Sequence, residues 1–223
     1  MEFRHELKHE ICYAELLEIR QRLHVIAKPD IYAVDGRYMV RSLYFDNAAD
    51  KALREKIDGV NMREKFRIRY YNHDPSWIVL EKKIKRGELG SKQSCPLTYE
   101  EAEALAMGEY QWMRDDSREL VYELYQKIYS QGLRAKTIVD YTREPFVYDA
   151  GNVRVTLDYD IRTGLHNTDF LNTDCITIPI RDMPMILEVK WDCFLPSVIR
   201  DAVMLKGQRT TSFSKYAACR MYD

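Results

Sequence analysis

Apolar and polar residues recur along this chain with two periods, one typical of strands and one typical of helices. Period-two alternation predicts strands, because successive side chains of a strand point to opposite faces. Together with stretches rich in β-forming residues, such as 38–45, this pattern predicts strands at residues 3–8, 38–45, 64–71, 77–85, 91–97, 135–143, 153–161 and 185–191. Apolar residues at helical spacing predict helices at 11–25, 48–57, 102–107, 116–131, 196–205 and 214–222. Consecutive strands joined by short turns predict an antiparallel meander, and therefore an α+β fold dominated by antiparallel strands.

Two of the expected helices begin with capping signals. Asn47 stands in an N-cap-like position before 48–57. Thr98 and Glu101 form the pattern of a capping box before 102–107. Side-chain oxygens at such positions accept hydrogen bonds from the first free N–H groups of a helix.

Charged residues gather on one face of strand after strand. In 64–71, Lys65, Arg67 and Arg69 share a face, because residues two apart in a strand point the same way. The same rule groups Glu6 with Lys8, Glu81 with Lys83 and Lys85, Arg154 with Asp158, and Glu188 with Lys190. The apolar faces suit burial beneath the helices, which leaves the charged faces directed at one another or at water.

If such a sheet closes, it encloses a charged channel with helices packed on the outside. Buried lysines and arginines without partners are strongly destabilising, so the channel would be wet or filled by an anion. A chain of phosphates offers acceptor oxygens to Arg forks and Lys ammonium groups. An ordinary sheet with one charged face toward solvent is the alternative that alternation alone leaves open.

Composition bounds the class of protein. The 223 residues are 46% hydrophobic and 31% charged, with a formal net charge of −1. A single domain over 1–223 is the simplest interpretation. No apolar run approaches the ~20 residues that cross a bilayer, and the start lacks a secretion signal, so a cytoplasmic protein is expected. Whole-chain charge predicts no attraction to nucleic acid or membranes, so any anion site must be local.

Cysteines, histidines and tryptophans do not indicate a metal site, a disulfide framework or a nucleic-acid platform. The five cysteines are scattered and never form a Cys-x-x-Cys pair, and the five histidines lack metal-ligand spacing. Reduced thiols are therefore expected, without disulfides or zinc. Trp77, Trp112 and Trp191 are expected in the core rather than on a base-stacking platform, because aromatic positions alternate with the charged ones.

Eight short segments occur in an order that resembles VTC domains, relatives of the CYTH and triphosphate tunnel enzymes. They are residues 4–8 (RHELK), 42–46 (SLYFD), 66–71 (FRIRYY), 80–83 (LEKK), 141–143 (YTR), 154–158 (RVTLD), 187–190 (LEVK) and 213–216 (FSKY). Each is weak alone, but together they span nearly the whole chain.

The resemblance implies an antiparallel β-barrel tunnel that binds a nucleoside triphosphate or polyphosphate and transfers the γ-phosphoryl group of ATP to a polyphosphate chain. By position, the phosphate-binding residues would be Lys8, Arg67, Arg69, Lys83, Lys92, Arg143, Arg154, Lys190 and Lys215. Of these, Arg67, Arg69 and Lys190 would act in catalysis together with Glu188.

A divalent metal, Mn²⁺ or Mg²⁺, is also implied by the resemblance. Glu188 would be its ligand, helped by Glu6 or Asp158. The first strand has Arg4-x-Glu6-x-Lys8 where the wider CYTH group has Glu-x-Glu-x-Lys. The missing carboxylate favours the more basic polymerase type over a metal-rich hydrolase.

Two other functions stay open at the level of the sequence. One is a metal-dependent triphosphatase or polyphosphatase, and the other is a non-catalytic module that binds polyphosphate or inositol phosphates. The expected ligands are ATP and polyphosphate or pyrophosphate, without nucleic acid or insertion of this chain into a membrane. The sequence leaves open a membrane-spanning partner and the oligomeric state.

Overall fold

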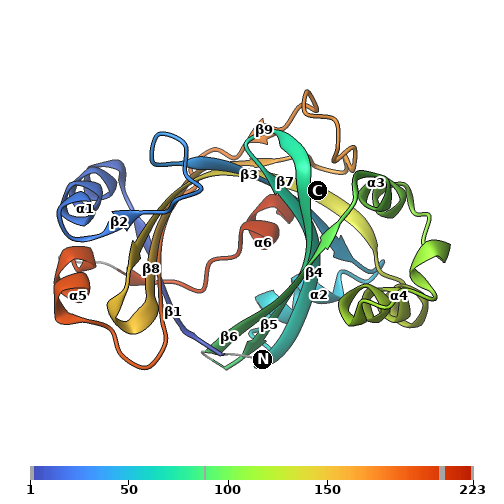
Figure 1. Cartoon of the computed structure of the whole chain (residues 1–223), viewed down its shortest axis with the longest axis horizontal. Coiled ribbons are helices and arrows are strands. Elements are labelled where there is room, and N and C mark those ends of the chain that lie inside the picture. The colour runs from blue at the N-terminus through green and yellow to red at the C-terminus, as the bar shows by residue number, and fades with distance from the viewer. Residues whose placement is uncertain (1–2, 88, 206–208, 222–223) are drawn as a thin grey trace.

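One antiparallel sheet curls into a tunnel in the computed structural model, which describes residues 3–87, 89–205 and 209–221 (Figure 1). Its long strands are β1 (His5–Ile11), β3 (Tyr38–Asp46), β4 (Met62–Tyr71), β5 (Asp74–Arg86), β6 (Leu89–Leu97), β7 (Arg134–Tyr148), β8 (Val153–Thr163) and β10 (Met185–Trp191). Short strands β2 (Lys28–Pro29), β9 (Ile178–Pro179) and β11 (Arg209–Thr210) flank them. The order across the sheet is β11-β1-β10-β8-β7-β3-β4-β5-β6, with β2 on β7 and β9 on β8. The expected α+β fold with antiparallel strands is confirmed.

The two ends of the curled sheet meet where β6 comes back to β1. The N–H of Arg4 donates to the carbonyl of Gly90 at 3.0 Å, and the N–H of Gly90 donates to the carbonyl of Arg4 at 3.2 Å. This contact is an isolated bridge rather than a ladder. The sheet therefore surrounds a tunnel without being closed by continuous hydrogen bonding.

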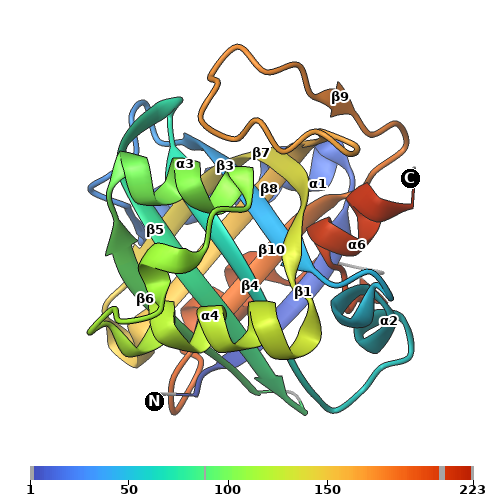
Figure 2. The same cartoon turned by 90° about the vertical axis from the view of Figure 1, so that its right-hand side faces the viewer.

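Four helices cover the outer surface of the sheet (Figures 1 and 2). They are α1 (Tyr13–Ile26) and α5 (Ser197–Val203) on one side, with α3 (Tyr99–Met107) and α4 (Glu119–Gln131) on the other. Their apolar faces pack on the outward residues of the strands, in two separate cores. One contains Leu16, Ile19, Leu157 and Leu187, and the other contains Phe66, Ile68, Leu120 and Leu124. Burial of the apolar faces outside leaves the charged faces inside, as the alternation predicts.

Two short helices, α2 (Lys51–Ile57) and α6 (Lys215–Arg220), lie together at one end of the tunnel (Figure 2). Tyr216 is buried, stacks on Tyr44 with ring centroids 5.0 Å apart, and donates its O–H to Asp46 at 2.8 Å. Helix α6 thus packs against the inward side of β3, whereas the sequence predicts helices on the outside. The reason is a patch of aromatic residues on that part of the inner wall.

Local signals explain where two helices begin. Helix α2 starts at Lys51 rather than 48, because the Asn47 side chain accepts from the N–H groups of Ala49 and Lys51 within a turn. The capping box of α3 is confirmed by Thr98 and Glu101. The expected burial of Trp77 is wrong, since this side chain is 63% exposed on β5.

Replacing Thr98 by Ala is expected to lower the free energy of unfolding by about 1 kcal/mol, a typical loss for an N-cap. The Thr98 hydroxyl accepts from the N–H of Glu101 at 3.2 Å, and the Glu101 carboxylate accepts from the N–H of Thr98 at 2.9 Å. Urea denaturation of Thr98→Ala measures the loss. Thr98→Ser keeps the hydroxyl and should stay near the parent; an equal loss in both variants would contradict the capping explanation.

Within the described part of the chain, no helix combines the length and the apolar character needed to cross a membrane.

Candidate functional site

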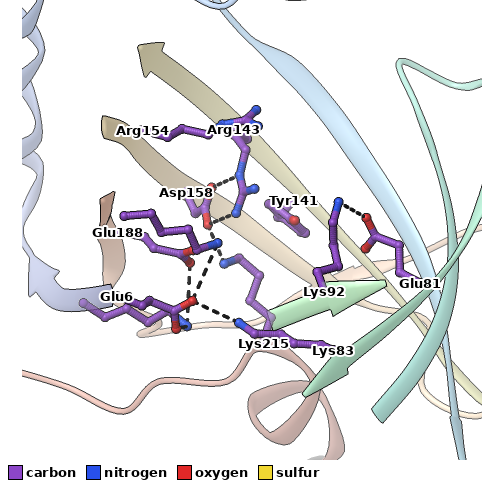
Figure 3. A network of polar contacts seen from close by, with 12 residues as sticks. Glu6, Glu81, Lys83, Lys92, Tyr141, Arg143, Arg154, Asp158, Glu188 and Lys215 are labelled. Atoms are coloured by element: carbon purple, nitrogen blue, oxygen red, sulfur yellow. Dashed lines mark hydrogen bonds and ion pairs between the residues drawn. The ribbon is translucent and has the colours of Figure 1, made fainter. Parts of the chain in front are cut away.

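The register of the strands brings charged side chains together inside the tunnel. Lys8 stands opposite Glu188, Arg67 opposite Glu81, and Arg143 opposite Asp158. The inward side chains include all the site residues expected from the sequence, namely Glu6, Lys8, Arg67, Arg69, Lys83, Lys92, Arg143, Arg154, Asp158, Glu188, Lys190 and Lys215. Figure 3 shows part of this set as two groups that face a common space, Glu81 with Lys92 on one side and Glu6, Asp158 and Glu188 with their cations on the other.

The first group surrounds Glu81, which is 2% exposed. Its carboxylate accepts from Arg67 Nε at 2.8 Å and from Lys92 Nζ at 2.8 Å, and Arg69 Nε lies 3.4 Å away. Burial alone would raise the pKa of the Glu81 carboxyl, but the charges of Arg69, Arg67 and Lys92 outweigh burial and hold it well below its usual range. Glu81 is therefore ionised and fixes three cations that the sequence predicts to bind phosphate.

The second group is built around Glu6 and Glu188. Lys8 Nζ lies 2.9 Å from Glu6 and 3.6 Å from Glu188, while Lys83 Nζ lies 3.2 Å from Glu6. Lys190 pairs with both carboxylates. Burial opposes ionisation of both acids, but the surrounding lysines keep the pKa of each below its usual range. Burial and the nearby charge of Lys8 together lower the pKa of Lys83 to about 7, despite the attraction of Glu6.

Asp158, fully buried, holds two of the predicted phosphate ligands in place. Arg143 donates to both of its oxygens at 2.7 Å, and Lys215 donates to it at 2.6 Å. Burial would raise the pKa of the Asp158 carboxyl, yet Arg143 and Lys215 lower it to about 2. Lys215 is thus an interior residue at the start of α6, not a surface residue of a terminal helix.

Arg154 is more exposed than Arg143 and Lys215, with 37% of its side chain accessible to solvent. It donates to Asp30 at 2.8 Å and to the Tyr38 hydroxyl at 2.7 Å. Its buried Nε makes no hydrogen bond among the described residues, and neither does Nε of Arg69. These N–H groups are donors that a phosphate oxygen could satisfy.

Tyr141 lies between the two groups, and the sequence gives it no role beyond a place in the motif (Figure 3). Lys215 Nζ lies 4.6 Å and the Arg143 guanidinium 5.3 Å from the centre of its ring. Arg69 donates to its hydroxyl at 3.3 Å. Burial would raise the pKa of this phenol, but Arg143, Arg69 and Lys215 lower it to about 8.

A phosphate chain in the tunnel is expected to raise the pKa of Tyr141 toward its ordinary value, because the ligand neutralises the three cations that lower it. The difference in absorbance between the parent and Tyr141→Phe during a pH titration isolates this phenol. Without ligand the midpoint should be about 8. Adding tripolyphosphate should move it upward. An unchanged midpoint in saturating ligand would show that the anion binds elsewhere.

Lys65, which is also absent from the predicted site residues, faces inward beside Lys83. Its Nζ donates to the Ser214 hydroxyl at 3.2 Å and lies 5.5 Å from the centre of the Tyr44 ring. Burial, and then the charges of Lys83 and Arg67, hold the pKa of Lys65 well below its usual range. The alternation on β4 placed Lys65 on this face, so the charge pattern itself was the signal for it.

Positive charge exceeds negative charge inside the tunnel. Ten lysines and arginines are named above, and the carboxylates that they contact are Glu6, Asp30, Glu81, Asp158 and Glu188. The basic side chains of this set therefore outnumber these carboxylates two to one. A cavity of about 1100 Å³ opens from the tunnel, lined in part by Lys8, Lys65 and Lys83. The space and its charge suit an extended polyanion.

The three carboxylates expected to bind a metal differ in their availability. No three carboxylate, histidine or cysteine groups of the described chain are arranged to hold an ion. Asp158 is also engaged by Arg143 and Lys215, which argues against it as a ligand. Glu6 and Glu188 share Lys8 and Lys190, so they converge on one place. Mg²⁺ is often bound by one or two carboxylates plus substrate phosphates, and this pair fits that mode.

A family model described as the VTC domain matches residues 3–222. Among solved structures, the chain is similar to a proposed adenylate cyclase from Bacillus halodurans, with 15% identity, a TM-score of 0.49, and coverage of 85% of this chain and 80% of that one. A proposed adenylate cyclase from Vibrio parahaemolyticus has 8% identity, a TM-score of 0.47, and coverage of 91% and 83%. The mimivirus capping enzyme triphosphatase has 12% identity, a TM-score of 0.39, and coverage of 86% and 81%. No curated protein matches the chain.

Proposed function

Since the chain belongs to the VTC domain family, we propose that it is a polyphosphate polymerase that moves the γ-phosphoryl group of ATP onto a polyphosphate chain. The observation that carries this proposal is the surplus of lysine and arginine along the inner wall of the tunnel. Such a wall suits a linear polyanion that offers one phosphate after another, as the donor nucleotide and the acceptor chain both do.

In the proposed reaction a terminal oxygen of the chain attacks the γ-phosphorus, and the bond to the β–γ bridging oxygen of ATP breaks to release ADP. Phosphoryl transfer requires in-line positioning and neutralisation of charge more than a protein nucleophile. Arg67 and Arg69 would bind the phosphate that is transferred, with Glu81 holding their guanidinium groups. Lys92, which shares Glu81, would bind a neighbouring phosphate.

The second group would bind the other phosphates of the donor and the acceptor. Arg143 and Lys215 are positioned for this by Asp158, and Arg154 lies nearer the exposed rim. Lys8, Lys83 and Lys190 would exchange their carboxylate contacts for phosphate contacts. Glu188 and Glu6 would hold Mn²⁺ or Mg²⁺, and the ion when bound would neutralise charge on the phosphate oxygens.

Incubation of the protein with ATP and Mn²⁺ is expected to produce polyphosphate, with or without a pyrophosphate primer. Gel electrophoresis separates the outcomes, because a polymerase makes long chains whereas a hydrolase releases free phosphate. If a preparation binds tripolyphosphate but forms neither product, this result would contradict catalysis and favour a binding module.

Glu188→Gln is expected to lower turnover about a hundredfold through loss of the metal ligand. Binding of tripolyphosphate without metal should persist, since Gln removes a carboxylate that competes with phosphate for Lys8 and Lys190. Isothermal titration measures this binding. The control for loss of a carboxylate is Glu10→Gln, on the same strand as Glu6. Unchanged turnover in Glu188→Gln would show that Glu188 is not a ligand of the proposed metal site.

A further inference from the structure

Positive side chains continue beyond the proposed transfer site to the mouth of the tunnel. The face of β4 that carries Arg69, Arg67 and Lys65 ends with Arg63. Four residues at alternate positions of a strand extend over about 20 Å, because each step of two residues covers roughly 6.6 Å. Arg63 also lines the 1100 Å³ cavity, together with Lys56 of α2 and Lys85 of β5.

The strand register places like charges directly opposite each other at this end of the tunnel. Arg63 is the partner of Lys85, and Lys65 is the partner of Lys83. Like charges directly opposite in an antiparallel pair are destabilising. Two successive pairs of this kind are explained if an anion binds between them.

The two carboxylates that line the cavity form ion pairs with lysines away from the mouth. They are Glu6, which pairs with lysines inside the tunnel, and Glu64, which pairs with Lys82 and Lys127 on the outer face. At the mouth, Lys56 donates to the Ser212 hydroxyl at 2.9 Å and Arg63 donates to the carbonyl of Val60 at 2.6 Å. Both cations therefore have neutral partners within the described residues.

The three mouth cations also act on one another electrostatically. Burial lowers the pKa of Lys56, and the charges of Arg63, Lys8 and Lys85 lower it further. Burial likewise lowers the pKa of Lys85, with Lys8 and Arg63 adding to the effect and Glu6 opposing it. Mutual repulsion of this kind is relieved by an anion.

We propose that Lys56, Arg63 and Lys85 form a distal subsite for those phosphates of a linear polyphosphate that extend beyond the tunnel interior. The proposal rests on the proposed function, because the interior must hold the rest of the chain. Lysine, arginine and the nearby Thr210, Thr211 and Ser212 hydroxyls all recognise phosphate oxygens. Linear polyphosphate is the chosen ligand because the subsite continues the basic face of β4 that is proposed to bind the rest of the same chain.

The test compares the affinities for tripolyphosphate and for a chain of about twenty phosphates by isothermal titration. A chain that occupies the interior and the distal subsite at once binds more tightly than a chain that occupies the interior alone. The variant is Lys56→Gln/Arg63→Gln/Lys85→Gln. A matched control, Lys28→Gln/Arg114→Gln/Arg200→Gln, removes three exposed positive charges outside the cavity. The parent should bind the long chain more tightly than tripolyphosphate.

In the mouth variant, affinity for the long chain is expected to fall about 30-fold, because charge contacts near the surface are individually modest. Affinity for tripolyphosphate should fall by less than about threefold. The control should lose less than about threefold for either ligand by long-range attraction alone. Thermal unfolding verifies that both variants are folded.

Equal losses for both ligands, or none for the long chain, would overturn the distal subsite. An oligonucleotide that loses as much affinity as polyphosphate in the mouth variant would overturn the choice of ligand. If the parent binds the long chain but not tripolyphosphate, the interior site of the proposed function fails as well. If the parent binds both equally, only the distal subsite fails.

Discussion

Arg67→Gln is expected to lower kcat/KM for ATP about a thousandfold, the scale of losing a preorganised group that stabilises charge in the transition state. Arg67 Nε donates to Glu81 at 2.8 Å and its NH1 donates to the Tyr44 hydroxyl at 2.7 Å. The guanidinium is thus held in a fixed orientation before substrate arrives. Glutamine keeps part of the volume but removes the charge.

The effect on stability should be smaller than the effect on activity. Glu81 keeps Arg69 and Lys92 as partners after the change, so the buried carboxylate does not become unpaired. Steady-state kinetics and thermal unfolding of the same preparation separate the two effects. Arg114→Gln, at an exposed position, is the control for loss of one positive charge.

A double variant separates a direct role of Arg67 in phosphate binding from a role in balancing the charge of Glu81. Arg67→Gln/Glu81→Gln removes a cation and the carboxylate that competes with phosphate for the remaining ones. Activity should stay low because the lost charge is not replaced. Recovery to near the parent rate in the double variant would show that Arg67 only balances Glu81, and a single variant of normal activity would exclude it from the site.

Asp158→Asn is expected to lower the free energy of unfolding by about 3–5 kcal/mol, the range for removing one partner of a buried ion pair. Asp158 is fully buried, and both Arg143 and Lys215 donate to its carboxylate. Asparagine leaves two buried cations without their counter-charge. Urea denaturation, monitored by circular dichroism, measures the loss.

A polyanion should rescue this variant more than it stabilises the parent. Tripolyphosphate would supply the negative charge that Arg143 and Lys215 have lost, so the rise in melting temperature on adding ligand should be larger in Asp158→Asn. Glu144→Gln, in an ion pair on the outer face with Arg20, is the matched control. Equal ligand-induced shifts in the two variants would show that the ligand does not reach Arg143 and Lys215.

The contribution of Asp158 to stability is expected to depend on pH. The folded-state pKa of Asp158, about 2, lies below the ordinary value of 3.8. A carboxyl with a lowered pKa stabilises the fold fully above its ordinary pKa and loses that contribution as pH falls through the folded value. The difference in stability between the parent and Asp158→Asn should therefore be constant near neutral pH and shrink between about pH 4 and pH 2.

The sequence determined which side chains share a strand face. Lys65, Arg67 and Arg69 alternate with Phe66 and Ile68, and the structure buries the apolar pair under α4 while the basic residues face inward. Alternation is local, because side-chain direction in a strand depends only on the parity of the position. The family's ordered segments then linked this charged face to phosphate chemistry.

Only the tertiary structure decided which charges meet. The pairs Glu81 with Arg67, and Asp158 with Lys215, join residues from separate elements, and their contacts depend on strand register and on the path of the C-terminal segment. The inward packing of α6 was not predicted, because its aromatic partner Tyr44 is distant in the chain. The like-charge pair of Arg63 and Lys85 is likewise a product of register, which alternation within one strand cannot specify.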